Sequence, residues 1–175
     1  MPIACDTRLN SRLSDEDRDR YQNARQIQDV LATAKTVAIV GMSTELTKPS
    51  NMVGSYLLDE GFTVIPVNPR ATEILGQKCY PDLKSIPIEV DVVDVFRPAK
   101  EVAAIVDEAI AIGAKAVWTQ LRIADLEASK RAQDAGLVAV ADKCIKMEHG
   151  RYGGQLHWAG MNTGIVTAQR RKARA

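Results

Sequence analysis

One stretch constrains the fold of this chain more than any other: a short run of apolar or small residues, 36–40, leads directly into Gly41. A continuous run of this kind, rather than an alternating one, is typical of a strand buried on both faces of a parallel sheet. Polar residues, a helical pattern and a second apolar run follow. This order predicts a strand–loop–helix–strand unit, in which the loop lies beside a helix N-terminus that favours a bound phosphate.

The rest of the chain continues this alternation. Main strands are predicted at residues 36–40, 62–67, 90–96, 115–120 and 137–141, with a short strand at 78–80. Helices are predicted at 15–33, at 51–60 with Ser50 as N-cap, at 98–112 and at 124–135. The spacing predicts an α/β, Rossmann-like, doubly wound parallel sheet with helices on both faces. We expect the dinucleotide-fold order, with the first strand central, the second strand on one side and the fourth and fifth on the other.

The chain of 175 residues divides into three predicted regions. Residues 1–34 are an N-terminal extension with a helix, residues 35–146 are the Rossmann-like domain, and residues 147–175 are an irregular tail that is glycine-rich and then basic. Residues 143–175 contain seven basic residues and one acidic residue. A solvated tail explains this charge more simply than a contact with nucleic acid or a membrane surface.

The cysteine pattern favours a reducing compartment. Cys5, Cys79 and Cys144 are odd in number and widely spaced, so a disulfide framework is not expected, and the cytoplasm fits best. We interpret Cys144 as a buried structural thiol, and no metal-binding spacing is present. No apolar run approaches the roughly 18 residues of a membrane span, and the first residues do not read as a signal peptide.

The loop after the first strand departs from the usual dinucleotide fingerprint. That fingerprint has three glycines, and an acidic residue after the second strand binds the ribose hydroxyls. Gly41 matches the first glycine, but Ser43 and Leu46 occupy the other two positions. Asn68 stands where the acid is expected. An ordinary NAD site is therefore disfavoured, and no Gly-Lys-Ser/Thr sequence supports a P-loop.

Hydroxyl and basic groups stand where the fingerprint is missing. Because the carboxyl ends of parallel strands meet at one edge of a sheet, residues that follow different strands are expected to face one crevice. Arginine there suits a phosphate on a ribose better than the bare hydroxyls. These groups favour a ligand with several phosphates, although Trp118 is almost as well explained by core packing. The residues are Ser43, Thr44, Lys48, Arg70, Arg97, Trp118 and Gln120.

Several motifs in a fixed order carry a family resemblance. They are Gly-Met-Ser at 41–43, Lys-Pro-Ser at 48–50, Val-Ile-Pro-Val-Asn-Pro at 64–69, Val-Val-Asp-Val-Phe-Arg at 92–97, Trp-Thr-Gln-Leu at 118–121 and Asp-Lys-Cys at 142–144. Over about residues 35–146, the chain resembles the small stand-alone CoA-binding proteins. These are relatives of the N-terminal CoA-binding domain of the succinyl-CoA synthetase α subunit.

The resemblance implies a Rossmann-type fold whose loops hold the ADP part of coenzyme A or of an acyl-CoA. The phosphorylatable histidine of the synthetase has no counterpart here, and Ile145 stands where many relatives have a proline. By position, the resemblance implies that the diphosphate is contacted by Gly41, Ser43 and Thr44, and that the ribose-phosphate and adenine are lined by Lys48, Asn68, Pro69 and Arg70. It also implies that adenine or the diphosphate is flanked by Phe96 and Arg97, and that the pantetheine path is bordered by Trp118, Gln120 and Leu121.

These patterns favour a protein that binds coenzyme A or an acyl-CoA without evident catalysis of its own. No nucleophile elbow or catalytic triad is visible, and Asp91, Asp94 and Asp142 lie in or beside strands without an evident partner. Two alternatives stay open. One is an enzyme, an NADP-dependent reductase or a CoA-dependent transferase, completed by the tail or by a partner chain. The other is a subunit-like module that needs another protein, or a second copy, for its chemistry.

Overall fold

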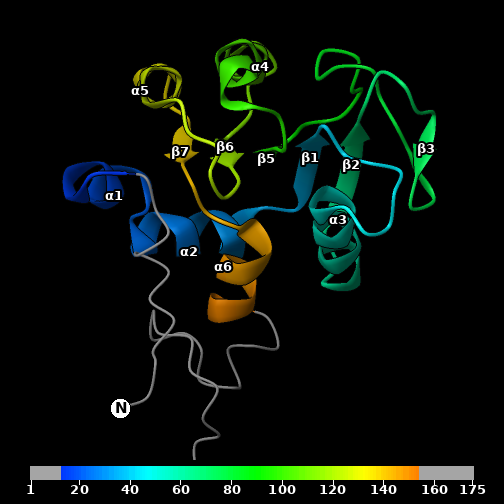
Figure 1. Cartoon of the computed structure of the whole chain (residues 1–175), viewed down its shortest axis with the longest axis horizontal. Coiled ribbons are helices and arrows are strands. Elements are labelled where there is room, and N and C mark those ends of the chain that lie inside the picture. The colour runs from blue at the N-terminus through cyan, green and yellow to red at the C-terminus, as the bar shows by residue number, and fades with distance from the viewer. Residues whose placement is uncertain (1–12, 154–175) are drawn as a thin grey trace, which may run out of the picture.

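The computed structural model describes residues 13–153, and the centre of this part is a five-stranded parallel sheet (Figure 1). Its strands are β1 (Thr36–Val40), β2 (Thr63–Val67), β5 (Val92–Val95), β6 (Ala116–Thr119) and β7 (Val138–Val140). The order across the sheet is β2-β1-β5-β6-β7. All residues of β5 and β6 are buried, as expected for strands covered on both faces. The predicted α/β doubly wound class is confirmed.

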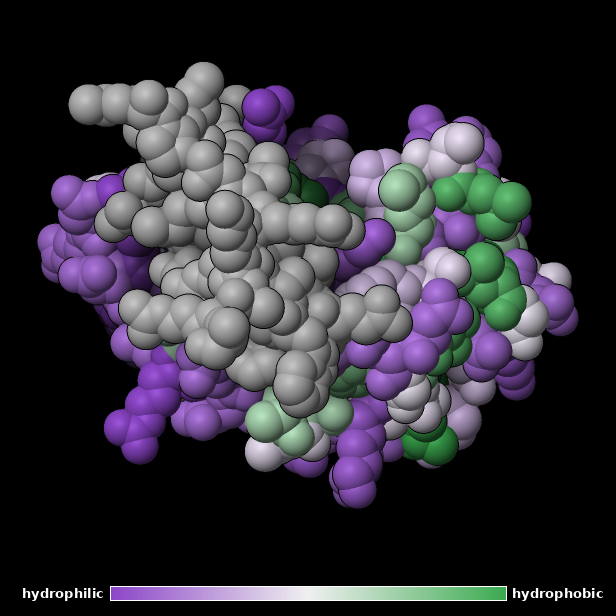
Figure 2. All heavy atoms as spheres, turned by 90° about the horizontal axis from the view of Figure 1, so that it is seen from below, coloured by the Kyte–Doolittle hydropathy of each residue, from purple (hydrophilic) through white to green (hydrophobic). Residues whose placement is uncertain are grey.

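Helices cover both faces of the sheet. On one face lie α4 (Ala99–Ala111) and α5 (Leu126–Asp134), and on the other lie α2 (Ala24–Thr33), α3 (Pro49–Asp59) and α6 (Ile145–Tyr152). The short α1 (Asp15–Tyr21) packs at the edge near β7 and contributes Tyr21 to the first core. Seen from the side of α2, α3 and α6, the coloured surface is mostly hydrophilic, with separate hydrophobic areas at one end (Figure 2). No helix in residues 13–153 is long and apolar enough to cross a membrane.

The predicted strand order is wrong in one respect: β5, the third main strand, lies directly beside β1 and is the middle of the sheet. The register pairs Ile39 of β1 with Asp94 of β5. The cause is the connection after β2, where residues 68–91 contain no helix and form the hairpin of β3 (Glu73–Ile74) and β4 (Gln77–Lys78). Leu83 and Val90 of this connection are buried in the same core as Ala38, so the chain crosses the face of β1 before it re-enters the sheet.

The predicted N-terminal helix is two helices. The helix is interrupted at Asn23. Oδ1 of Asn23 accepts hydrogen bonds from the backbone N–H groups of Arg25 (3.1 Å) and Gln26 (3.2 Å). An asparagine side chain that binds nearby backbone donors competes with the helical pattern and favours an N-cap. Asn23 therefore ends the continuous helix and starts α2.

The start of α3 also differs from the prediction. Pro49 occupies the first helical position, and the N-cap Lys48 makes no side-chain capping bond. Ser50, the predicted cap, is buried, and its Oγ accepts a hydrogen bond from the backbone N–H of Ser43 at 3.0 Å. The serine therefore holds the loop after β1, and the N-terminus of α3 has no side-chain cap.

Helix α6 is not predicted by the sequence, which indicates no regular element after residue 141 and an irregular tail from residue 147 onward. Its buried residues include Glu148 and Arg151, which pair with both Nη1–Oε distances at 3.1 Å, while Lys143 lies 3.4 Å from the same carboxylate. A helix that buries an ion-paired cluster lacks the apolar stripe by which amphipathic helices are recognised. The predicted tail from residue 154 onward lies outside the described residues.

Candidate functional site

A pocket of about 370 Å³ lies at the carboxyl edge of β1 and β2, beside the turn that follows β5. From β1 the chain proceeds to β2 on one side, while β5 lies on the other, and such a switch point leaves a crevice above the strand ends. The pocket brings together five of the predicted site residues. They are Gly41, Asn68, Pro69, Arg70 and Arg97.

Position 41 needs a glycine for two reasons: its backbone conformation and the closeness of the Arg97 side chain. Its φ of +84° lies in the left-handed region that side chains disfavour, and its N–H donates to the carbonyl of Val67 at 2.9 Å. A Cβ at this position would lie 2.6 Å from Cδ of Arg97 and 3.0 Å from the carbonyl oxygen of Phe96. The absence of a side chain at Gly41 therefore lets the aliphatic part of Arg97 pack directly against the backbone of residue 41.

Asn68 connects the loops after β1 and β2. Its Nδ2 donates to the carbonyl of Met42 at 2.8 Å, and its Oδ1 accepts from the backbone N–H of Arg70 at 2.9 Å. An acid could not make the first of these bonds, because a carboxylate has no N–H donor. Asn68 thus replaces the expected acid for a reason of local structure, and it fixes the backbone of Arg70 at the pocket.

The two arginines of the pocket differ in their partners. Arg97 donates from Nε and Nη2 to the two carboxylate oxygens of Glu101, at 2.7 and 3.0 Å. The hydrogen bond from Arg97 holds the pKa of Glu101 below its ordinary value, so this carboxylate is ionised at neutral pH. Arg70 is exposed, and within residues 13–153 its guanidinium has no hydrogen bond or ion pair.

The acidic side of the pocket is not predicted from the sequence. Three carboxylates line it together with the two arginines: Asp82 from the helix-free connection, and Glu101 and Glu108 from α4. The spacing of four residues between Arg97 and Glu101 was the signal that could have revealed one of them. Asp82 and Glu108 come close only through the tertiary fold.

The loop between Gly41 and α3 lies beside the pocket and does not line it. Ser43 is held at three points: its Oγ accepts from Glu45 N–H at 3.1 Å, its N–H donates to Ser50, and its carbonyl accepts from Nδ2 of Asn51 at 2.9 Å. Thr44 is exposed, and Lys48 makes only a 3.8 Å ion pair with the exposed Glu45. The N-terminus of α3 has no side-chain cap, and it presents the positive end of a helix dipole to this loop.

The remaining predicted residues are not brought to the pocket. Trp118 is fully buried in the core, and its Nε1 donates to the carbonyl of Lys143 at 2.7 Å. Gln120 is buried as well, Phe96 is half-buried against the core, and Leu121 is 49% exposed beyond β6. The structure therefore places Trp118 and Gln120 in the interior, beneath the carboxyl edge.

Asp94 is a buried carboxyl group on the middle strand. Oδ1 accepts from Nε2 of Gln120 at 2.7 Å, and Oδ2 has no hydrogen-bond partner among the described residues. Burial raises the pKa of Asp94 to about 7. The partner that the sequence did not reveal is thus Gln120, whose side chain is used to support this carboxyl. Asp142 has a partner too, because its Oδ1 accepts from the backbone N–H of Arg122 at 2.6 Å.

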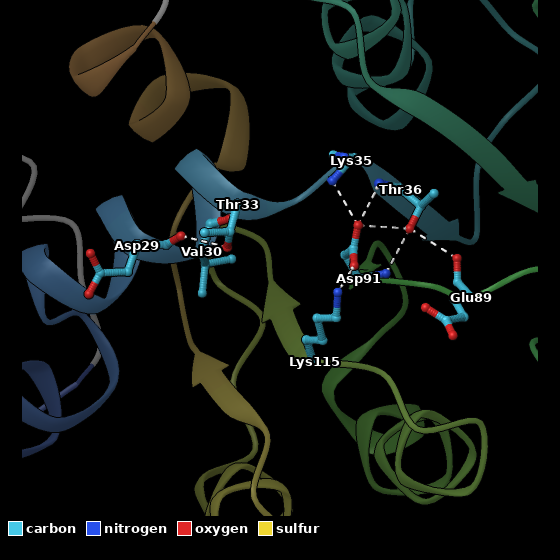
Figure 3. Close-up of polar contacts among 8 residues, drawn as sticks. All are labelled: Asp29, Val30, Thr33, Lys35, Thr36, Glu89, Asp91 and Lys115. Carbon is cyan, nitrogen blue, oxygen red and sulfur yellow. Dashed lines mark hydrogen bonds and ion pairs between the residues drawn. The ribbon is translucent and has the colours of Figure 1, made fainter.

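Asp91 lies at the opposite, amino edge of the sheet (Figure 3). Its Oδ2 accepts from the backbone N–H groups of Lys35 (2.7 Å) and Thr36 (3.0 Å), and Nζ of Lys115 lies 2.6 Å from Oδ1. Burial alone would raise the pKa of Asp91, but these donors outweigh burial and hold the pKa well below its ordinary value. The carboxylate therefore ties the starts of β1, β5 and β6 together, and its role is structural.

The described residues offer no centre for metal or disulfide chemistry. No group of three or more His, Cys, Asp or Glu residues within 13–153 is placed to hold a metal ion. Cys79 and Cys144 are free thiols, and burial raises the pKa of both. Neither thiol is therefore activated for attack.

Comparison with known proteins gives consistent matches. A protein-family model described as a CoA binding domain matches residues 35–150. Protein YneT of Bacillus subtilis is 33% identical over 124 residues, which make up 71% of this chain and 92% of YneT. The ADP-forming acetate–CoA ligase II of Archaeoglobus fulgidus is 40% identical over 83 residues, or 46% of this chain, but the match spans only 12% of the ligase.

The solved structures agree with these sequence matches. A hypothetical protein from Pyrococcus horikoshii OT3 superposes with a TM-score of 0.72 at 42% identity, over 74% of this chain and 92% of the other. A protein from Thermus thermophilus superposes with a TM-score of 0.71 at 34% identity, over 74% of this chain and 98% of the other.

Proposed function

Since this chain belongs to the CoA binding domain family, we propose that it binds coenzyme A or an acyl-CoA at the pocket above β1 and β2. The observation that carries the proposal is the meeting of Gly41, Arg70 and Arg97 at one switch point of the sheet. A nucleotide with several phosphates needs close backbone approach and guanidinium groups, and this edge supplies both.

The proposed ligand would lie along the carboxyl edge of the sheet. Arg70 would bind the ribose phosphate and Pro69 would border the adenine, because the pocket holds both residues. The diphosphate would pass over Gly41 toward the uncapped N-terminus of α3, where Ser43, Thr44 and Lys48 stand at the rim. These last three residues would contact the ligand from outside the pocket.

The pantetheine arm would run along the same edge past β6. Leu121, which is 49% exposed, would border it. We assign Trp118 and Gln120 an indirect role, because both are buried and their polar groups already bond to Lys143 and Asp94. They would hold the end of β6 in place. Phe96 would act through its backbone, whose carbonyl oxygen lies beside Gly41.

The proposal is a binding function without catalysis by this chain alone. The ligase match supports a second form of it, in which this chain is the CoA-holding module of a larger assembly with a partner protein or a second copy. Turnover by the purified protein would instead favour the transferase or the NADP-dependent reductase.

We also propose a cytoplasmic location, which the free thiols of Cys79 and Cys144 support. The three regions 1–34, 35–146 and 147–175 are proposed as functional divisions of the chain.

Calorimetric titration of the nucleotide-stripped protein tests the proposal. CoA, dephospho-CoA, NADP and NAD are titrated in parallel at one ionic strength. We expect CoA to bind, and dephospho-CoA to bind more weakly because Arg70 loses its phosphate partner. Binding of NADP without a response to CoA would contradict the proposal and favour the reductase. Arg70→Gln should remove most of the preference for CoA over dephospho-CoA.

A further inference from the structure

We propose that Glu101 competes with the ligand for Arg97, so that Arg97 binds a phosphate only after the ligand displaces the Glu101 carboxylate. The inference rests on the proposed function, because it concerns the same pocket. It adds a residue that sets affinity and ligand choice: Glu101 selects for ligands with enough negative charge at this point to take its place.

The ion pair uses both oxygens of the Glu101 carboxylate. They accept from Arg97 at 2.7 and 3.0 Å, and both side chains line the pocket. Arg97 has five N–H donors in a planar fork, and Glu101 occupies the Nε–Nη2 edge, which is one of the two edges that can hold a phosphate through two hydrogen bonds. A phosphate must therefore approach Arg97 from another direction or replace the carboxylate.

The position of Arg97 favours replacement. Its Cδ lies only 2.6 Å from where a Cβ of Gly41 would be, so the side chain rests directly on the backbone over which the diphosphate is proposed to pass. The side chains of Arg97 and Glu101 are 47% and 35% exposed, so solvent weakens their attraction. A phosphate with a larger negative charge than a carboxylate can take over such a pair, whereas an uncharged nucleoside cannot.

The contrast with Arg70 points the same way. Arg70 lines the same pocket and is not paired within residues 13–153, so it is ready for a phosphate at once. The pocket thus holds one unpaired arginine, Arg70, and one arginine paired with a carboxylate, Arg97. Ligands that reach only Arg70 gain one arginine contact, and ligands with phosphates at both positions gain two.

The test compares two substitutions on α4 that remove the same charge. Glu101→Gln removes the partner of Arg97, and Glu108→Gln removes a carboxylate that lines the same pocket without pairing with Arg97. Both proteins are titrated with CoA and with inorganic pyrophosphate, after circular dichroism has shown that they fold. We expect Glu101→Gln to bind both probes about two- to fivefold more tightly than Glu108→Gln does, as an exposed pair of this kind predicts.

Equal effects of the two substitutions would overturn the inference, and so would weaker binding by Glu101→Gln, which would mean that Glu101 only positions Arg97. The Arg97→Gln background gives a second check, because the advantage of Glu101→Gln should disappear there. If the wild type does not bind CoA while the pyrophosphate difference persists, the proposed function fails and this inference stands. If a Gln variant does not fold, Glu101→Ala and Glu108→Ala make the same comparison.

Discussion

At the scale of single residues, the contact between Gly41 and Arg97 carries the most information about the site. A Cβ on Gly41 would meet Cδ of Arg97 at 2.6 Å, and the residue has a φ of +84°. We expect Gly41→Ala to lower the free energy of unfolding by about 1–3 kcal/mol and to weaken CoA binding, because Arg97 must move away from residue 41. Urea denaturation and calorimetry measure the two effects.

Gly76→Ala is the matched control for this substitution. Gly76 also has a positive φ, +72°, in the turn between β3 and β4, but a Cβ there would meet nothing within 4 Å. It should therefore show the backbone penalty with unchanged CoA affinity. If both variants bind CoA like the wild type, the contact between Gly41 and Arg97 has no part in binding.

At the scale of secondary-structure elements, Asp91 holds the amino ends of three strands together. The pKa of Asp91 is held below its ordinary value in the folded state, so its ionised form stabilises the fold at neutral pH. This contribution is present above the unfolded pKa of about 4 and is lost as the pH falls toward the folded pKa. We expect Asp91→Asn to cost about 2–3 kcal/mol at pH 7, because the amide lacks the charge that strengthens the bonds from the N–H groups of residues 35 and 36, and its NH2 group can face Nζ of Lys115.

Denaturation at several pH values checks this expectation. The stability difference between wild type and Asp91→Asn should be largest at pH 7 and should shrink below pH 4 or so. Asp29→Asn is the control, because the exposed Asp29 lines a pocket of about 250 Å³ at the same edge with Asp91 and Lys115. A difference that does not change with pH would show that the charge of Asp91 is not what stabilises the strand ends.

The elements themselves were largely predictable from the sequence, but their arrangement was not. Buried strands show as apolar runs, so all five main strands were found. An apolar run has the same appearance in the sequence whatever the position of its strand in the sheet, so the place of β5 beside β1 could not be predicted. Asn23 divides a helix through a single side chain, and α6 buries Glu148 with Arg151, so neither feature has a clear apolar signal.

The candidate site follows the same division. Gly41, Asn68, Pro69, Arg70 and Arg97 come directly after strands, and parallel strands bring such residues to one edge. Glu101 and Glu108 belong to a helix whose rotation depends on packing, so only the structure places them in the pocket. Trp118 illustrates the converse, because a residue near a strand end can still point into the core.

At the scale of the whole molecule, ligand binding should raise the stability of the fold. A ligand that binds only the folded state at about 100 times its dissociation constant adds about 2.7 kcal/mol. For a chain of this size we expect CoA to raise the melting temperature by about 5–10 °C. Differential scanning fluorimetry with CoA and with adenosine measures the effect, and equal shifts with both would contradict a phosphate-dependent site.

One wall of the pocket comes from the helix-free connection between β2 and β5, through Pro81, Asp82 and Leu83. Surface loops accept insertions and deletions more readily than strands or helices do. Changes in the length of the more exposed stretch 84–89 can therefore reshape that wall, while the buried Leu83 and the register of all five strands stay fixed. The strand ends with Gly41 are thus held by the sheet, whereas the opposite wall of the pocket can change to fit another ligand.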